Sequence, residues 1–238
     1  MKPKAAARAP RLFVEAPLGP DLTVAFAADT AHYLVNVLRR SPGDRVVLFN
    51  GRDGEWAGEL VAARKKTAEA RILEQLRPQD FPPDLHYCFA PIKRARVDYI
   101  AQKATELGAS LIQPVVTHHT DSERVNTDRL RANAVEAAEQ CGVLWVPDIA
   151  APMNFARYLE ARDTGRLLVF CDESAPVADP VAALRAAPAG PIAVLIGPEG
   201  GFSEEERTQL SRAPNVLPIS LGPRIMRADT AGVAAGGT

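Results

Sequence analysis

The sequence predicts an α/β protein of two domains, in which a small β-barrel precedes a larger domain built on a parallel sheet. Short strands with tight turns fill residues 45–76. Three prolines within residues 77–84 interrupt any regular element. Strands then alternate with helices, which is typical of a parallel α/β sheet. We therefore predict a barrel over residues 1–78 and the α/β domain over residues 84–238.

The elements of the barrel follow from local patterns. Leu34, Val37 and Leu38 recur at helical spacing, and Asp29 or Thr30 precedes them as a cap for a short helix. Asn-Gly and Asp-Gly pairs mark the turn of a hairpin, and the segment after the hairpin alternates apolar and polar side chains. Strands are predicted over residues 45–50, 55–63 and 67–76.

The α/β domain is predicted from apolar runs that alternate with amphipathic segments. Thr127 and Ser203 are expected to cap two of its helices, and Gly108 is expected to end another. In chain order the elements are strand 85–91, helix 93–108, strand 111–116, helix 127–141, strand 166–171, helix 178–187, strand 191–197, helix 203–212 and strand 215–220.

Composition and residue patterns exclude secreted, membrane and collagen-like proteins. The chain is 47% hydrophobic and 24% charged, which is ordinary for a globular protein. None of its three cysteines belongs to a CxxC pair, the usual spacing of a metal site. No apolar run reaches the roughly 20 residues that span a bilayer. The basic first residues lack the apolar stretch of a secretory signal. His118 and His119 would point to opposite sides of an extended segment. We predict a cytoplasmic protein without membrane or metal binding.

Basic residues exceed acidic ones in the first 80 residues, whereas the remainder carries an acidic excess. Such asymmetry indicates that the barrel contacts a polyanion, although a solvated surface with a chance imbalance explains it equally well. Arg64 and Lys65 lie in a predicted turn that either is simply solvated or contacts RNA phosphates.

The loop after strand 191–197 reads LIGPEGGFSEEE. In open parallel sheets, ligands bind beyond the carboxyl ends of the strands, and glycines let a backbone approach them closely. The loop lacks the lysine and hydroxyl of a phosphate loop and the spacing of a dinucleotide loop, and Glu199 with Glu204–Glu206 disfavours phosphate charge. Either the loop is a tight connection to a capped helix, or it binds a neutral or cationic ligand through its backbone.

The loop after strand 215–220 reads LGPRIMRADTAG. Arg224 and Arg227 suit an electron-rich partner such as a nucleobase carbonyl or a phosphate, because a guanidinium donates several hydrogen bonds in one plane. The alternative is a pair of surface arginines that precede a helix capped by Asp229 or Thr230.

These two loops resemble the RsmE family of SPOUT methyltransferases. The resemblance extends to HYLVNVLRRSPGD, KRARVDYIAQKATELGASLIQPVVT, EAAEQCG and VPDI, and covers nearly the whole chain. It implies a PUA-like barrel, a SPOUT-type parallel sheet with a trefoil knot, and a homodimer. It also implies S-adenosylmethionine as the cofactor and N3 of a uridine in 16S ribosomal RNA, in the small ribosomal subunit, as the methyl acceptor.

The sequence departs from the family pattern at three places. His118-His119-Thr120 stands where Glu-Arg-Ser or Glu-Arg-Thr is usual, Val143 stands where many members have arginine, and Asp229 stands where glutamate is usual.

The predicted site falls into three groups of residues. Arg227 would stabilise the charge that develops on the uracil carbonyl oxygens, and Glu199 and Asp229 are alternatives for the base. The cofactor is expected at Cys171, Leu195, Ile196, Gly197, Pro198, Glu199, Gly200, Gly201, Leu221, Gly222, Pro223, Ile225 and Met226. RNA is expected at Arg8, Arg11, Arg39, Arg40, Arg64, Lys65, Lys93, Arg94 and Arg224.

Two other functions remain open. A non-catalytic ribosome-assembly factor would use the barrel to bind RNA and the second domain only to dimerise. A SPOUT enzyme acting on tRNA ribose would share the cofactor loops but methylate a hydroxyl group.

Overall fold

In the computed structural model the chain divides into two units, which are described separately. The first contains residues 1–81 and 138–145, and the second contains residues 82–137 and 146–238. The structure describes residues 9–92, 94–120, 125–173, 175, 179–221 and 230.

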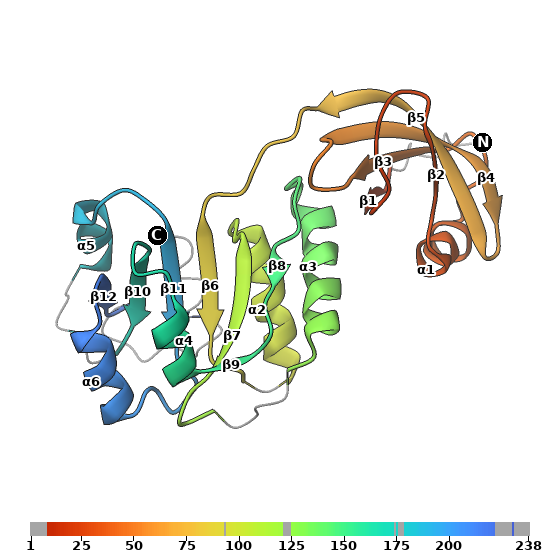
Figure 1. The fold of residues 1–238 in the computed structure, drawn as a ribbon. Coiled ribbons are helices and arrows are strands. Elements are labelled where there is room, and N and C mark those ends of the chain that lie inside the picture. Colours follow the sequence, from red (N-terminus) through yellow and green to blue (C-terminus); the bar gives the residue numbers. More distant parts are fainter. Residues whose placement is uncertain are drawn as a thin grey trace. The chain divides into compact units, whose positions relative to one another are not determined.

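The first unit is a curled five-stranded sheet around an apolar core (Figure 1). Its strand order is β1-β3-β4-β5-β2, with β1 parallel to β3 and the other neighbours antiparallel. The predicted strands are confirmed, and two three-residue strands add to them. The bounds are β1 (Arg11–Phe13), β2 (Thr23–Ala25), β3 (Arg45–Phe49), β4 (Glu55–Arg64) and β5 (Thr67–Arg77).

The predicted helix of this unit begins earlier than its sequence suggests. It consists of α1 (Ala28–His32) and a π-helical turn, η1 (Tyr33–Val37). Its N-cap is Ala27, without a side-chain hydrogen bond, so the prediction that Asp29 or Thr30 caps the helix is wrong. Asp29 lies in the first turn instead, where a carboxylate still interacts favourably with the helix dipole.

The second unit is built on a parallel sheet with the strand order β12-β10-β11-β6-β7-β8, and β9 also pairs with β7. The strand pairs described in it are parallel, as predicted. The strands are β6 (Leu85–Phe89), β7 (Leu111–Val116), β8 (Asp148–Ile149), β9 (Met153–Asn154), β10 (Leu167–Cys171), β11 (Ile192–Ile196) and β12 (Val216–Ile219).

Helices cover both faces of this sheet (Figure 1). They are α2 (Arg94–Glu106), α3 (Thr127–Cys141), α4 (Phe155–Ala161), α5 (Pro180–Ala186) and α6 (Glu204–Arg212). Side chains of α2, α3 and α5 pack with Val169 and Val194 on one face, and those of α4 and α6 pack with Phe170 and Leu195 on the other. Successive strand residues thus enter opposite cores, which is why β10 and β11 are apolar throughout.

Local signals located most elements of the second unit but not all of their ends. Asn126, rather than the predicted Thr127, caps α3, because its Oδ1 accepts the Arg129 N–H. Ser203 caps α6 as predicted. Sequence patterns did not predict α4, β8 and β9, which are short. Across the described residues, no helix is long and apolar enough to cross a membrane.

The trefoil knot stays a prediction. The family resemblance places it in the C-terminal part of the chain, where residues 222–229 and 231–238 lie outside the described residues.

Candidate active site

The glycine loop after β11 forms a tight turn at the carboxyl edge of the parallel sheet. The Gly201 N–H donates to the Pro198 carbonyl oxygen at 3.0 Å, and Gly201 has a φ of 68°, a conformation that favours glycine. A Cβ on Gly197 would lie 2.7 Å from the ring of Phe202, which stacks edge-on against Phe170. Gly197 therefore serves packing within the α4 and α6 layer. Gly200 and Gly201 shape the turn itself.

The first turn of α6 connects this glycine loop to two other strand ends. Glu206 Oε2 accepts the Ser203 N–H at 2.9 Å in a capping box, while its Oε1 accepts the His118 N–H at 2.8 Å, just beyond β7. Arg207 Nη2 lies 3.2 Å from Asp172 Oδ1, just beyond β10. One helical turn thus holds three strand-end loops together.

Two of the four acids of the glycine loop, Glu199 and Glu206, are less available to a ligand than the sequence indicated. Glu199 Oε1 lies 3.0 Å from Arg96 Nη1 of α2, and Glu206 is buried in its capping box. Glu204, 3.7 Å from Arg207, and Glu205 are exposed. Acidic charge at the loop therefore disfavours a phosphate ligand less than the sequence indicated, but the loop still lacks the lysine and hydroxyl of a phosphate loop.

His118 and His119 lie in a turn rather than on an extended segment. The Thr120 N–H donates to the Thr117 carbonyl oxygen at 3.1 Å, and the two imidazole rings meet edge to face, 4.9 Å between centroids. The prediction that they point to opposite sides is wrong, because a turn does not alternate side-chain directions as a strand does. Within the described part of the chain, no group of three His, Cys, Asp or Glu residues could hold a metal ion.

His119 covers the glycine turn. Its Nδ1 lies 3.2 Å from the Gly201 carbonyl oxygen, and a Cβ on Gly200 would come within 3.2 Å of the His119 Cβ. Sequence reasoning gave no role to His119, Arg96 or Arg207. It treated Glu206 only as negative charge, although the S-x-x-E pattern over residues 203–206 is the signature of a capping box.

The structure places the remaining predicted cofactor residues as follows. Leu195 and Ile196 send their side chains into the two cores, so their backbone alone could contact a ligand. Cys171 ends β10 beside β11, and burial raises the pKa of its thiol to about 12, which keeps it neutral. Leu221 packs against the α2 and α3 layer. The remaining predicted site residues lie outside the described residues; they are Gly222, Pro223, Arg224, Ile225, Met226, Arg227 and Asp229.

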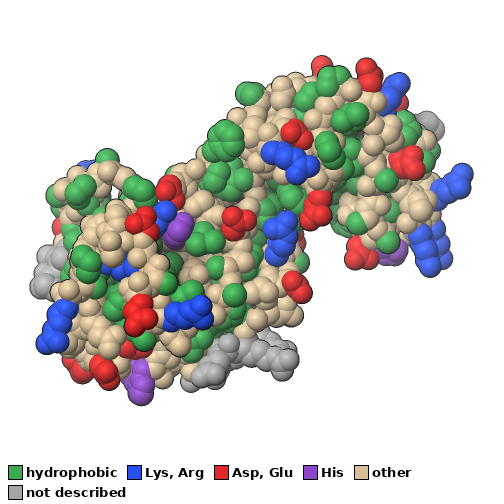
Figure 2. All heavy atoms as spheres, viewed as in Figure 1, with side chains coloured by type: hydrophobic (Ala, Val, Ile, Leu, Met, Phe, Trp, Pro, Cys, Tyr) green, Lys and Arg blue, Asp and Glu red, His purple; other side chains and the backbone are tan. Residues whose placement is uncertain are grey.

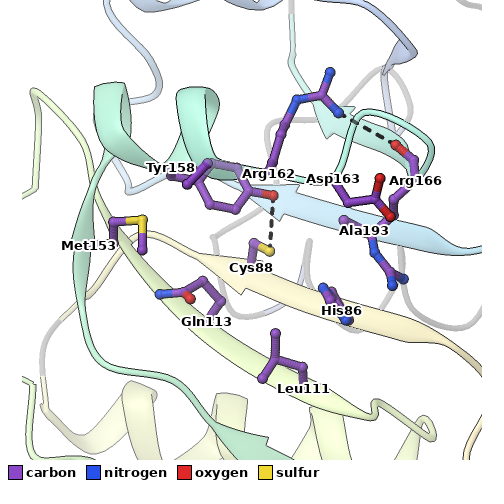
Figure 3. Close-up of a pocket in the computed structure, with 11 residues that line it drawn as sticks. His86, Cys88, Leu111, Gln113, Met153, Tyr158, Arg162, Asp163, Arg166 and Ala193 are labelled. Carbon is purple, nitrogen blue, oxygen red and sulfur yellow. Dashed lines mark hydrogen bonds between the residues drawn. The ribbon is translucent and has the colours of Figure 1, made fainter.

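A separate cavity of about 170 Å³ lies beneath α4 (Figure 3). It opens near the amino-terminal ends of β6, β7 and β11, at His86, Leu111 and Ala193. The Tyr158 hydroxyl and the Cys88 thiol point toward each other in it, 3.3 Å apart. Because ligands of parallel sheets bind at the carboxyl ends of the strands, this cavity is not the predicted cofactor site.

The predicted RNA-contacting residues of the first unit separate into two groups. Arg39, Arg64 and Lys65 are exposed, and the Asn36 side chain donates to the Lys65 carbonyl oxygen at 3.2 Å, which joins η1 to the β4–β5 turn. Figure 2 shows basic side chains projecting where α1 and β4 lie. Arg40 is half-buried. Arg8 and Lys93 lie outside the described residues, as does the side chain of Arg94.

Arg11 has a different position. Its side chain is 14% exposed, and its Nε lies 2.6 Å from Glu55 Oε1. The same guanidinium donates to the carbonyl oxygens of Ala138 and Val143 and lies 3.8 Å from the centre of the Phe49 ring. Its donors are engaged inside the unit, so we remove Arg11 from the proposed RNA surface.

Comparison with known families and structures identifies the kind of protein. The family profile of an RNA methyltransferase domain matches residues 79–238, and that of an RNA methyltransferase PUA domain matches residues 26–73. A ribosomal RNA small subunit methyltransferase E from Rickettsia conorii is 30% identical over 227 residues, which cover 94% of this chain and 92% of the relative. The chain belongs to the ribosomal RNA small subunit methyltransferase E family. The predicted resemblance to the RsmE family is thus confirmed.

Other members of the methyltransferase E family agree with this assignment. The relative from Synechocystis is 32% identical over 229 residues, covering 94% of this chain and 72% of its own length. The crystal structure of the Neisseria gonorrhoeae member, bound to S-adenosylmethionine, superposes with a TM-score of 0.86. It is 27% identical, and the match covers 96% of this chain and 95% of that one. The PUA-like and α/β domain types predicted from sequence are confirmed.

Proposed function

We propose that this protein transfers a methyl group from S-adenosylmethionine to N3 of a uridine in 16S ribosomal RNA. The observation that carries the proposal is the glycine turn at the carboxyl edge of the parallel sheet, in a chain of a family with a member crystallised with S-adenosylmethionine. The acceptor atom, N3 of a uridine, follows from the family resemblance.

The residues at this edge fit S-adenosylmethionine. Gly200 and Gly201 carry no side chains, so a ligand can approach the turn closely. The Gly201 N–H and carbonyl are engaged by Pro198 and His119, so we assign the hydrogen bonds to an uncharged adenosine to the backbone groups of Gly200 and the preceding loop residues. The neutral thiol of Cys171 adds no charge at the adjacent strand end. We propose that the backbone of residues 195–201 and 221–226 holds the cofactor, which supplies an electrophilic methyl group when bound.

We propose that Arg227 lowers the barrier by stabilising the uracil oxygens. N3 of uridine must lose its proton before it attacks a methyl group, and the negative charge then spreads onto the neighbouring carbonyl oxygens. A guanidinium can donate to such an oxygen in the plane of the base. Arg224 is the second candidate for this role. Asp229 stays a candidate for the base, whereas Glu199 is less suited because its carboxylate is paired with Arg96.

The proposed substrate also implies a place and an assembly. A protein that modifies the small ribosomal subunit acts in the cytoplasm, and the exposed Arg39, Arg64 and Lys65 provide charge for an RNA backbone. We further propose a homodimer, as the family resemblance implies, in which two chains complete the active site.

The decisive experiment is nucleoside mass spectrometry. The protein is incubated with S-adenosylmethionine and small ribosomal subunits from a strain that lacks the homologous enzyme, and 3-methyluridine is expected. A ribose-methylated nucleoside, with tRNA as the better substrate, would support the tRNA alternative. Calorimetry that detects no cofactor binding at millimolar S-adenosylmethionine would support the assembly factor.

A further inference from the structure

His119 occupies a defined position against the glycine turn. The turn that carries it is fixed at both ends, since the Thr117 N–H donates to Thr120 Oγ1 at 2.9 Å and the His118 N–H donates to Glu206 at 2.8 Å. Its ring lies over Gly200, where a Cβ would meet the His119 Cγ at 3.5 Å. The imidazole therefore lies beside the part of the loop proposed to hold the cofactor.

The hydrogen bond to Gly201 sets the tautomer of the ring. A carbonyl oxygen can only accept, so the 3.2 Å contact with Nδ1 requires the proton to be on Nδ1. In the neutral imidazole the other nitrogen, Nε2, then carries a free electron pair. His119 is exposed, so the ring is accessible to a substrate. The loop thus presents a pre-oriented proton acceptor at the carboxyl edge of the sheet.

We propose that His119 is the general base that removes the N3 proton of the target uridine, an inference that rests on the proposed function. Nε2 accepts the N3 proton, and the N3 electron pair forms the bond to the methyl carbon. The electron pair of the breaking carbon–sulfur bond stays on sulfur, which leaves S-adenosylhomocysteine. The imidazolium then returns its proton to water.

The charged surroundings of His119 make it the better base among the described residues at this edge. Glu199 is paired with Arg96, and Glu206 accepts two backbone N–H groups. A neutral imidazole has a free electron pair on one ring nitrogen and can therefore act as a general base. Among the described residues, the titratable and charged groups that face the turn are His118, Glu173, Glu199, Glu206, Arg96 and Arg207.

The kinetic test uses three variants and a pH series at saturating cofactor and RNA. In His119→Gln the amide can still donate to Gly201 but cannot act as a base, so kcat is expected to fall about 10²-fold or more. The decline of kcat toward acid pH in the wild type should vanish in this variant. His119→Ala should be partly rescued by added imidazole. His118→Gln removes the neighbouring ring and should leave kcat and its pH profile nearly unchanged.

A second measurement is independent of turnover. ¹⁵N NMR of the wild-type protein above pH 8 should show His119 protonated on Nδ1 and bare on Nε2, and calorimetry should find the same cofactor affinity in wild type and His119→Gln. Full activity of His119→Gln, the opposite tautomer, or loss of cofactor binding in that variant would overturn the proposal. If the wild type forms no 3-methyluridine, the proposed function itself has failed.

Discussion

Cys88 shows how burial alone decides the chemistry of a residue. Burial raises the pKa of its thiol to about 12, and the hydroxyl of Tyr158, whose own pKa is also raised by burial, lies 3.3 Å away. Cys141 is exposed. At pH 8 we expect iodoacetamide to alkylate Cys141 while Cys88 and Cys171 stay unmodified, as peptide mass spectrometry would show. Urea-unfolded protein is the control, in which all three should react equally.

The same pKa shift predicts how stability depends on pH. Because the folded-state pKa of Cys88 lies above its unfolded value of about 9, this thiol contributes stability below about pH 9 and loses it as the pH rises toward about 12. Urea denaturation of wild type and Cys88→Ala between pH 8 and pH 11 measures this. The difference in unfolding free energy between the two proteins should shrink with rising pH. A constant difference would contradict the prediction.

Arg227 is predicted to act on the transition state rather than on cofactor binding. Arg227→Ala should lower the methyl-transfer rate by about 10²–10³-fold, the scale of removing one oxyanion donor. Cofactor affinity should change little, because the proposed adenosine contacts are made by the backbone. Arg227→Lys should restore little activity, since an ammonium lacks the planar pair of donors. A variant that loses cofactor binding but keeps its turnover at saturation would make Arg227 a pocket residue.

At the scale of elements, α6 organises the proposed site through its first turn. Glu206 satisfies the N–H groups of both Ser203 and His118. Glu206→Ala should lower the unfolding free energy by about 1–3 kcal/mol, because it removes the acceptor of two part-buried N–H donors. It should also weaken cofactor binding, since the glycine loop and the 117–120 turn lose their common support. Glu205→Ala, which removes an exposed acid from the same turn, is the control. Urea denaturation and calorimetry measure both effects.

Substitution of two glycines of the same loop should have different effects, one on fold stability and the other on cofactor binding. Gly197→Ala should destabilise the fold by about 1–3 kcal/mol, because its Cβ would lie 2.7 Å from the Phe202 ring. Gly200→Val should leave the protein folded, because the nearest neighbour of Gly200 is the exposed His119. It should abolish cofactor binding, because a side chain at this position blocks the close approach of a ligand to the backbone. Thermal unfolding and calorimetry separate the two outcomes. Retained binding by folded Gly200→Val would place the cofactor elsewhere.

At the scale of the whole molecule, the first unit is proposed to supply RNA affinity without taking part in the chemistry. Arg64→Gln with Lys65→Gln should weaken RNA binding and reduce its salt slope by about 0.7 for each phosphate that the variant no longer neutralises. Cofactor affinity should stay the same. Arg45→Gln with Arg71→Gln, which removes two other exposed charges of the unit, is the matched control. An unchanged salt slope in the first variant would mean that the RNA lies on the other unit.

Local sequence patterns predicted much of this protein. The strands of the parallel sheet are apolar on both faces, and their lengths and flanking helices identified the α/β class directly. Ser203 with Glu206 carries its capping signal within four residues, so the start of α6 could be predicted. The glycine loop was recognisable for the same reason, because its backbone requirement is encoded by adjacent residues.

Tertiary structure alone decided which residues meet. No local pattern brings His119 to Gly201, 82 positions away, or Arg11 to Glu55 and the end of α3. Sequence reasoning assigned Arg11 to RNA because an arginine in a basic segment has the same local signature whether it is exposed or buried. Burial and pairing depend on the packing of distant elements. That packing places Arg11, a predicted RNA contact, in an internal ion pair with Glu55. It also places His119, to which the sequence gave no role, beside the glycine turn, where we propose that it acts as the base.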